Sequence, residues 1–213
     1  MRREMLTCLV YLFLFVTISK AQVHTNPGLN PDQKENFFLP HPNFKSFVNI
    51  FIGYCYPNVD QNYLPRYEEM YHGHISQTGP LMAAIDYQFN KKTSIGLIVT
   101  RGTVNASYYD SSSHQKIFTA ELSSWACMLD VVRYIPINQK VFPYIRTAIG
   151  INSWKQDYTD IDGSKAPVTP VVLPRLSYQA GIGAKFILLR NVAVFIEGGY
   201  GKYVFDAGLS VKL

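Results

Sequence analysis

One serine and histidine grouping in the sequence could be drawn as a hydrolase triad. His114 follows Ser111, Ser112 and Ser113, and Glu121 lies seven residues further on. A serine activated by a histidine that a carboxylate orients is the arrangement of acyl-transfer enzymes. Adjacent residues of a strand point to opposite faces, however, and serine-rich stretches are ordinary turn chemistry. We therefore predict a solvated loop here and assign no catalytic residue.

A second cluster carries side chains that bind transition metals. His72 and His74 stand two residues apart, close to Glu68 and Glu69. Imidazole and carboxylate groups are suitable ligands, but this spacing is not diagnostic of a metal site. We favour a polar loop over a metal site at this position.

The most acidic stretch of the chain contains Asp157, Asp160 and Asp162. It is similar to part of a calcium-binding loop but lacks the bidentate glutamate that closes such a loop at its twelfth position. We favour a solvated turn over a cation site. The sequence also has no phosphate-cradling glycine loop, dinucleotide fingerprint or Cys-x-x-Cys pair, so we predict neither a metal nor a cofactor.

Composition narrows the function classes before any element is placed. The 213 residues suffice for one domain or two small ones, and 47% hydrophobic against 16% charged residues is too apolar for a disordered chain. Aromatic residues make up 14%, which suits β-structure better than a helical bundle. The formal net charge of +5 is not gathered into a basic stripe, so no nucleic-acid partner is predicted.

Residues 1–21 have the organisation of a signal peptide. Arg2 and Arg3 form a basic region, residues 8–18 are apolar, and the small Ala21 precedes a cleavage site. This segment predicts export from the cytoplasm. The apolar run is too short to cross a membrane as a helix.

Two further segments follow the predicted signal peptide. Residues 22–44 are rich in asparagine and proline and have no apolar period, which predicts an N-terminal periplasmic arm or linker. Residues 45–213 contain no apolar stretch long enough for a membrane helix. The third segment is expected to form the folded domain.

The segment 45–213 alternates between apolar and polar residues with a period of two. In residues 81–89 every odd position is apolar or aromatic, whereas Asp86 and Gln88 are polar. This pattern is typical of a strand with one apolar and one polar face. Eight segments show it: 48–56, 81–89, 95–99, 125–131, 141–151, 176–186, 192–200 and 207–213.

The connections between these segments alternate between short and long. The short turns are 90–92, 135–140 and 189–191. The long polar segments are 58–78, 102–115 and 155–170, and the brief connection 201–206 falls on their side. An even number of strands with short turns at one end and longer loops at the other is typical of outer-membrane barrels, whose closure leaves no unpaired edge in lipid. We predict an all-β, eight-stranded antiparallel up-and-down transmembrane β-barrel.

The polar face of the predicted strands should point into the barrel. Eight strands enclose a space just wide enough for side chains to fill, so inward charges are expected to pair across the lumen rather than line a wide pore. An unpaired buried charge would be strongly destabilising. The expected structural network consists of Asp86, Asp130, Arg146, Lys185, Glu197 and Lys212.

The two cysteines beyond the signal peptide are expected to remain free thiols. By parity, Cys55 faces the lumen and Cys127 faces lipid. Their strands, the first and the fourth, are not neighbours in an eight-stranded meander. Side chains placed in this way do not approach within the roughly 4.4–6.8 Å between Cα atoms that a disulfide requires.

Several short motifs resemble the small outer-membrane β-barrel domain family that is common in Bacteroidetes, with an OmpA/OmpX-like architecture. They are the terminal segment 208–213, with Leu213 where an aromatic residue is usual, and the segments 79–81, 86–87, 94–97 and 197–201. The resemblance implies the cell outer membrane of a Gram-negative bacterium. It also implies outer-membrane lipid, lipopolysaccharide and the barrel assembly machinery as partners.

The function expected from this resemblance and from the long loops is non-enzymatic. The protein is predicted to have a structural or surface-interaction role, through loops that contact lipopolysaccharide, a protein partner or a host surface. Three alternatives remain open: a narrow channel, a lipid-modifying outer-membrane enzyme, and a soluble ligand-binding barrel.

Overall fold

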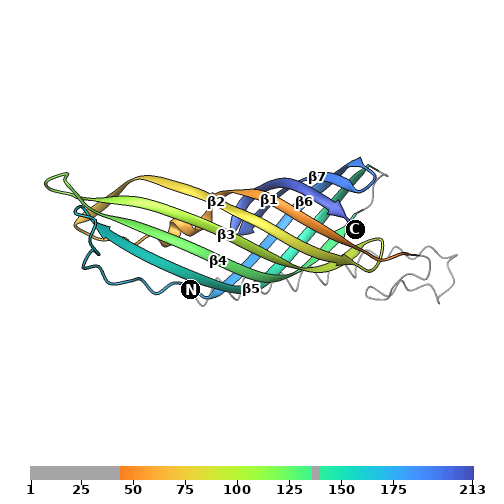
Figure 1. The fold of residues 1–213 in the computed structure, drawn as a ribbon, viewed down its shortest axis with the longest axis horizontal. Helices are drawn as coiled ribbons and strands as arrows, with labels where there is room; N and C mark the ends of the chain where they lie inside the picture. Colours follow the sequence, from red (N-terminus) through yellow and green to blue (C-terminus); the bar gives the residue numbers. More distant parts are fainter. Residues whose placement is uncertain (1–43, 136–139) are drawn as a thin grey trace, which may run out of the picture. The chain divides into compact units, whose positions relative to one another are not determined.

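The chain forms a closed antiparallel barrel of eight strands (Figure 1). The computed structural model describes residues 44–135 and 140–213, so the predicted signal peptide and the predicted arm up to residue 43 lie outside the described residues. Each strand pairs with the next in sequence, and β8 pairs with β1. The predicted fold class is confirmed. The strands are Phe47–Asn58 (β1), Met70–Gln88 (β2), Thr93–Asp110 (β3), Lys116–Tyr134 (β4), Val141–Asp160 (β5), Leu176–Leu189 (β6), Val192–Gly201 (β7) and Tyr203–Lys212 (β8).

The two ends of the barrel differ in their connections. The β2–β3, β4–β5 and β6–β7 turns lie at one end, the turn end, where β1 also begins and β8 finishes. The other connections lie at the opposite end, the loop end. One of them contains the 3₁₀ helix η1 (Val59–Tyr63). Among the residues described, no helix has the length and apolar character needed to cross a membrane.

A ring of apolar side chains surrounds the outside of the barrel and is open to the surroundings. Ile149, Ile182 and Ile52 are 59%, 69% and 65% exposed. Soluble monomers rarely leave a continuous apolar surface of this kind in water, whereas a transmembrane barrel presents it to lipid. Exposed aromatic residues flank the ring as two girdles, with Tyr54, Tyr56, Trp125, Tyr178 and Tyr200 toward the loop end and Tyr87 and Phe186 toward the turn end.

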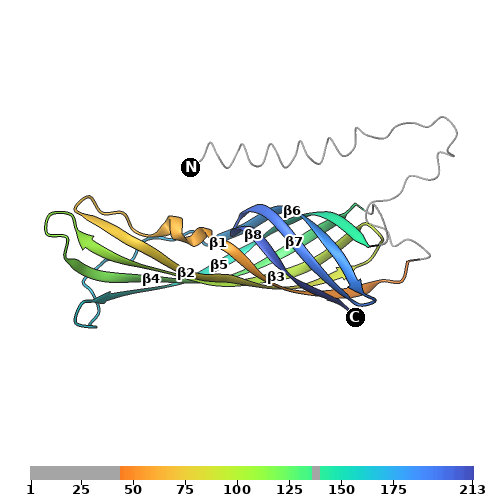
Figure 2. The same ribbon diagram turned by 90° about the horizontal axis from the view of Figure 1, so that it is seen from above.

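Strands β2 to β5 continue past the apolar ring and project from one side of the barrel (Figures 1 and 2). The prediction of long loops at 58–78, 102–115 and 155–170 was therefore wrong in part, because strand structure covers much of each segment. The projecting part, which we call the extension, consists of residues 70–79, 102–110, 116–124 and 152–160.

Where the extension begins, the apolar residues of the alternating pattern move from the outer face of the strands to the inner face. In β3, Val104, Ala106 and Tyr108 point inward and are buried, whereas inside the ring Ile95 and Leu97 point outward. Outside lipid, polar residues face water and apolar residues form a core, as in a soluble sheet. Because these strand segments have no apolar residues on their outer face, the sequence analysis interpreted them as loops.

The inner face of the extension has a hydrophobic core of its own. Tyr108 stacks on Phe118, with ring centroids 4.7 Å apart and planes at 10°. The connection that contains η1 contributes Leu64, and the β5–β6 connection contributes Ala166. Both connections are thus folded onto the sheet. The extension is a packed substructure and not a set of free loops.

The structure places the two cysteines as the parity of the sequence predicts. Cys55 is buried in the lumen, Cys127 is exposed on the outer face, and both are free. Because β1 and β4 are not neighbours in the barrel, we expect alkylation of the denatured protein without reductant to modify two cysteines per mature chain. Mass spectrometry measures this number. An intramolecular bridge in the folded protein would contradict the strand order.

The orientation of β2 can be tested at Ile85, which is 51% exposed on the apolar ring. Ile85→Arg should destabilise the barrel in lipid by about 2–4 kcal/mol, because it places a charge against the hydrocarbon. Asp86→Asn is the matched control on the opposite face, since the amide retains an oxygen that accepts from Arg146. Urea unfolding in lipid vesicles gives both values. The reverse ranking would mean that the faces of β2 are exchanged.

Candidate functional site

Arg146 lies at the centre of a buried ion cluster inside the barrel. Its guanidinium is 3.4 Å from Asp86 Oδ2, 3.2 Å from Asp130 Oδ2 and 3.1 Å from Glu197 Oε2. The four side chains are inaccessible to solvent and come from β5, β2, β4 and β7. Tyr144 donates a further hydrogen bond of 3.0 Å to Glu197 Oε2. The cluster therefore ties four strands together across the lumen.

A glycine between two of the acids makes room for them. In the strand registers Asp86 lies opposite Gly96, and Gly96 lies opposite Asp130. A Cβ atom at Gly96 would come within 2.7 Å of Asp130 Oδ1 and would overlap Asp86 Oδ1. The two carboxylates thus lean over the bare backbone of β3 toward the same guanidinium. A side chain at this position would push them apart.

The two predicted network lysines lie outside this cluster, toward the turn end. Lys185 Nζ donates to Asn49 Oδ1 at 3.0 Å. Lys212 Nζ lies 3.8 Å from the centre of the Phe47 ring and is exposed. Neither forms an ion pair with a carboxylate of the described residues. The predicted pairing of all six charges is therefore not what the structure shows, because these lysines lie where the lumen opens.

A buried acid that the sequence analysis missed lies beside the cluster. Asp206 is inaccessible to solvent, and in the strand registers it is opposite Glu197 on β7 and Cys55 on β1. Its carboxylate lies beside the Cys55 thiol. The sequence analysis placed it in the connection 201–206. Asp206 has the same parity as Gly208 and Ser210, and this pattern could have predicted that its side chain faces inward.

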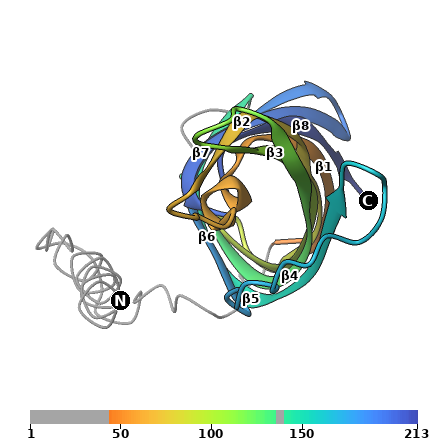
Figure 3. The same ribbon diagram turned by 90° about the vertical axis from the view of Figure 1, so that its left-hand side faces the viewer.

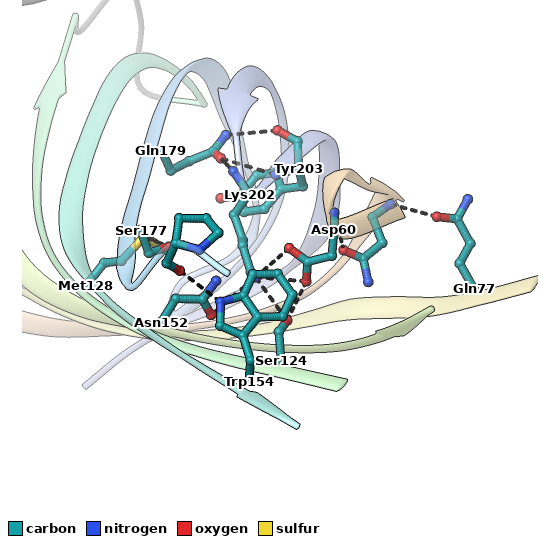
Figure 4. A network of polar contacts seen from close by, with 12 residues as sticks. Asp60, Gln77, Ser124, Met128, Asn152, Trp154, Ser177, Gln179, Lys202 and Tyr203 are labelled. Atoms are coloured by element: carbon teal, nitrogen blue, oxygen red, sulfur yellow. Dashed lines mark hydrogen bonds and ion pairs between the residues drawn. The ribbon is translucent and has the colours of Figure 1, made fainter. Parts of the chain in front are cut away.

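A second ion pair closes the lumen at the loop end (Figure 4). Lys202 Nζ is 2.8 Å from both carboxylate oxygens of Asp60, and Ser124 donates to the same carboxylate. Lys202 also lies 4.7 Å above the Trp154 ring. Asp60 belongs to η1, which lies within the ring of strands when the barrel is viewed from the loop end (Figure 3). We call this group the loop-end latch.

The β7–β8 turn holds the lysine of the latch in place. Gly201 has a φ of 141°, a conformation that favours glycine, and it lets the chain reverse around the single residue Lys202. Gln179 Oε1 accepts hydrogen bonds from the backbone N–H groups of Lys202 at 2.8 Å and Tyr203 at 3.3 Å. The latch was not predicted, because its two charges are 142 residues apart in sequence.

The serine and histidine grouping forms a tight turn at the tip of the extension. Asp110 Oδ1 accepts from the backbone N–H groups of Ser112 at 2.9 Å and Ser113 at 2.6 Å. The bonds from Ser113 are the main reason why the pKa of the Asp110 carboxyl is lowered. His114 has a positive φ of 56°, and Glu121 is exposed on the outer face of β4. The serines and His114 thus lie in a turn, and Glu121 lies apart from them on the outer face of β4.

The histidine pair lies on an exposed part of β2. His72 and His74 are both exposed, and His72 Nδ1 lies 3.3 Å from the Gly73 carbonyl oxygen. Glu68 and Glu69 precede the strand and are also exposed. In the part of the chain that the structure describes, no three His, Cys, Asp or Glu side chains are grouped so that they could hold a metal ion.

The carboxylates of the acidic stretch at the end of β5 bind to groups that are close in sequence. Asp157 pairs with Lys155 at 2.6 Å on the surface. Asp160 Oδ1 accepts from the N–H of the next residue, and Asp162 Oδ1 accepts from the Ser164 N–H at 2.9 Å. Hydrogen bonds from Ser164 lower the pKa of Asp162. These carboxylates stabilise a turn and do not converge on one point.

Comparisons with known proteins are limited to solved structures, because no family model and no curated protein matches the sequence. A designed transmembrane β-barrel aligns over 78% of this chain and 95% of its own, with 13% identity and a TM-score of 0.41. Ail, the attachment invasion locus protein of Yersinia pestis, aligns over 79% and 97%, with 15% identity and a TM-score of 0.41. The outer membrane protein OprG of Pseudomonas aeruginosa aligns over 79% and 95%, with 11% identity and a TM-score of 0.42.

Proposed function

We propose that the protein is a non-enzymatic outer-membrane β-barrel of a Gram-negative bacterium that presents the extension as a rigid interaction surface outside the cell. The observation that carries this proposal is the change of faces along β2 to β5. Within the apolar ring these strands turn apolar residues outward, and beyond it they enclose a core of their own. A structure held in this way above the lipid has a defined shape that a partner can recognise.

The outer face of the extension has the chemistry of a polar contact surface. Hydroxyl and amide groups dominate on the central strands, and a Thr103–Ser123 hydroxyl contact of 3.0 Å links them. The outward residues are Thr103, Asn105 and Ser107 on β3 and Thr119, Glu121 and Ser123 on β4. Lipopolysaccharide, which borders the outer surface of such a barrel, and a surface partner are the proposed contacts. The barrel assembly machinery is the proposed partner for insertion.

The filled lumen favours this role over the alternative of a narrow channel. Phe51 and Phe195 are inaccessible to solvent and meet edge to face, with ring centroids 5.4 Å apart. Arg146 lies 5.0 Å above the Phe51 ring, and the loop-end latch lies beyond it. Side chains therefore occupy successive levels of the barrel. We expect planar-bilayer recordings of the protein to match the protein-free control.

The orientation of the barrel is the decisive test of this function. In a Cys127→Ser background, Val172→Cys places a thiol at a loop-end residue that is 97% exposed, and Lys91→Cys places one in the β2–β3 turn. A membrane-impermeant maleimide should label Val172→Cys on intact cells and Lys91→Cys only after the outer membrane is permeabilised. Labelling of Lys91→Cys alone on intact cells would place the extension in the periplasm and refute the proposal.

A further inference from the structure

Beyond the filled levels of the lumen, the barrel opens at its turn end as a pocket of about 250 Å³. Side chains at the ends of strands β1, β2 and β4 to β8, together with the β6–β7 turn, line it. This turn-end pocket is separate from the extension and from the loop-end latch. Nothing in the function proposed above uses it.

Among the described residues that line the turn-end pocket, three are cations and none is an acid. Lys185 is 7% exposed and reaches in from β6, Arg190 comes from the β6–β7 turn, and Lys212 comes from the end of β8. In residues 44–135 and 140–213 none of the three has a carboxylate within ion-pair distance. Like charges gathered at the mouth of a low-dielectric cavity produce a positive potential that attracts an anion.

The rest of the turn end strengthens this potential. The described strand ends and turns there carry the basic residues Lys45, Lys91, Arg190 and Lys212. The acids of the barrel lie deeper in the lumen or toward the loop end. An anion that approaches from the turn end therefore meets basic groups first.

The remaining lining of the pocket suits a phosphate group with an apolar attachment. Asn191 and Ser210 add amide and hydroxyl groups that donate hydrogen bonds, whereas the Gln88 amide already donates to the carbonyl oxygens of Asn90 and Lys91. Phe47 and Phe142 provide ring surfaces beside them, and Lys212 Nζ lies over the Phe47 ring. An arginine fork and lysine ammonium groups together match the charge and the oxygen geometry of a phosphate.

We propose that the turn-end pocket binds a phosphate group, either free or as the headgroup of a phospholipid, through Lys185, Arg190 and Lys212. Phosphate neutralises the three cations, and the rings accept a glycerol or acyl portion where one is attached. This inference holds whatever the extension contacts. It concerns the opposite end of the barrel.

Nuclear magnetic resonance of the folded protein in an uncharged maltoside detergent tests the proposal. The two probes are sodium phosphate and dihexanoyl phosphatidylglycerol, each compared with sodium chloride at equal ionic strength. The amide signals of Asn191 and Ala193 should shift in a saturable way, whereas the signal of Gly163 at the loop end should not. Saturation by phosphate alone identifies a free-phosphate site. Saturation only by the phospholipid identifies a headgroup site, and both results support the proposal.

Matched variants separate the pocket from the general charge of the turn end. The double variant Arg190→Gln, Lys212→Gln should weaken binding by about tenfold or more, because two charge-assisted contacts are lost. Lys91→Gln removes a charge at the same end but outside the pocket, so it should lower the affinity far less than the double variant does. The altered residues of all these variants are exposed, and gel mobility without boiling verifies folding. Shifts no larger than those with chloride, or equal affinity of the double variant and Lys91→Gln, would overturn the proposal.

Discussion

Arg146→Met is expected to prevent most of the protein from folding into the barrel. Methionine occupies a similar space but leaves Asp86, Asp130 and Glu197 without their shared cation. Removing one partner of a buried ion pair costs about 3–5 kcal/mol, and Arg146 has three partners. A domain with a total stability of about 5–15 kcal/mol loses a large part of it.

The folding yield of Arg146→Met is measured on a gel, where a folded barrel migrates faster unboiled than boiled. A variant that combines Arg146→Met with Asp86→Asn, Asp130→Asn and Glu197→Gln should recover much of the folded band. The reason is that replacing all members of a buried ionic group by neutral residues is often close to neutral for stability. This recovery separates the loss of charge balance from the loss of volume.

Arg101→Met is the control for the loss of an arginine as such. Arg101 is exposed on the outer face of β3, where its guanidinium lies 5.1 Å above the Trp125 ring. Its replacement should leave the folded band nearly unchanged, because exposed charges contribute little to stability. Equal folding of Arg146→Met and Arg101→Met would show that the lumen cluster does not stabilise the barrel.

Lys202→Met is expected to release η1 from the loop end while the barrel stays folded. The change leaves the carboxylate of Asp60, which is 2% exposed, without its cation inside the barrel. The local loss is about 3–5 kcal/mol, which η1 avoids by moving into water. Trypsin should then cleave after Arg66, which is exposed just beyond η1, about 100-fold faster than in the unaltered protein.

The surface pair Lys155–Asp157 is the matched control for the latch. Its side chains are 75% and 48% exposed, so Lys155→Met removes an ion pair that contributes little to stability. The cleavage rate after Arg66, measured by mass spectrometry of the fragments, should not change in this variant. If Lys202→Met were cleaved no faster than Lys155→Met, the latch would not hold η1 in place.

The alternation of the sequence was sufficient to predict the barrel and the faces of its strands within lipid. Ile85 and Asp86 lie on the outer and inner faces of β2 as their parity predicts, and Cys55 and Cys127 lie on opposite faces as expected. Period-two alternation can be read locally, because each residue of a strand reverses the direction of the one before it. Even strand number and short turns at one end then predict closure.

The extension could not be predicted from the same pattern. Val104 and Ala106 alternate with the polar Asn105 and Ser107 as regularly as residues of the ring, yet they point inward. A period of two shows that the two faces of a strand differ, but it does not show which face meets lipid, water or a core. That assignment depends on how far each strand extends beyond the membrane.

Only the tertiary structure determines which side chains contact one another inside the lumen. The sequence indicates that Asp86, Asp130, Arg146 and Glu197 face inward, but the latch between Asp60 and Lys202 and the position of Asp206 do not follow from it. Which inward side chains meet depends on the stagger between strands, which accumulates through every strand pair until the barrel closes. No local segment of sequence determines this total stagger. Contacts across the lumen are therefore defined only in the closed barrel.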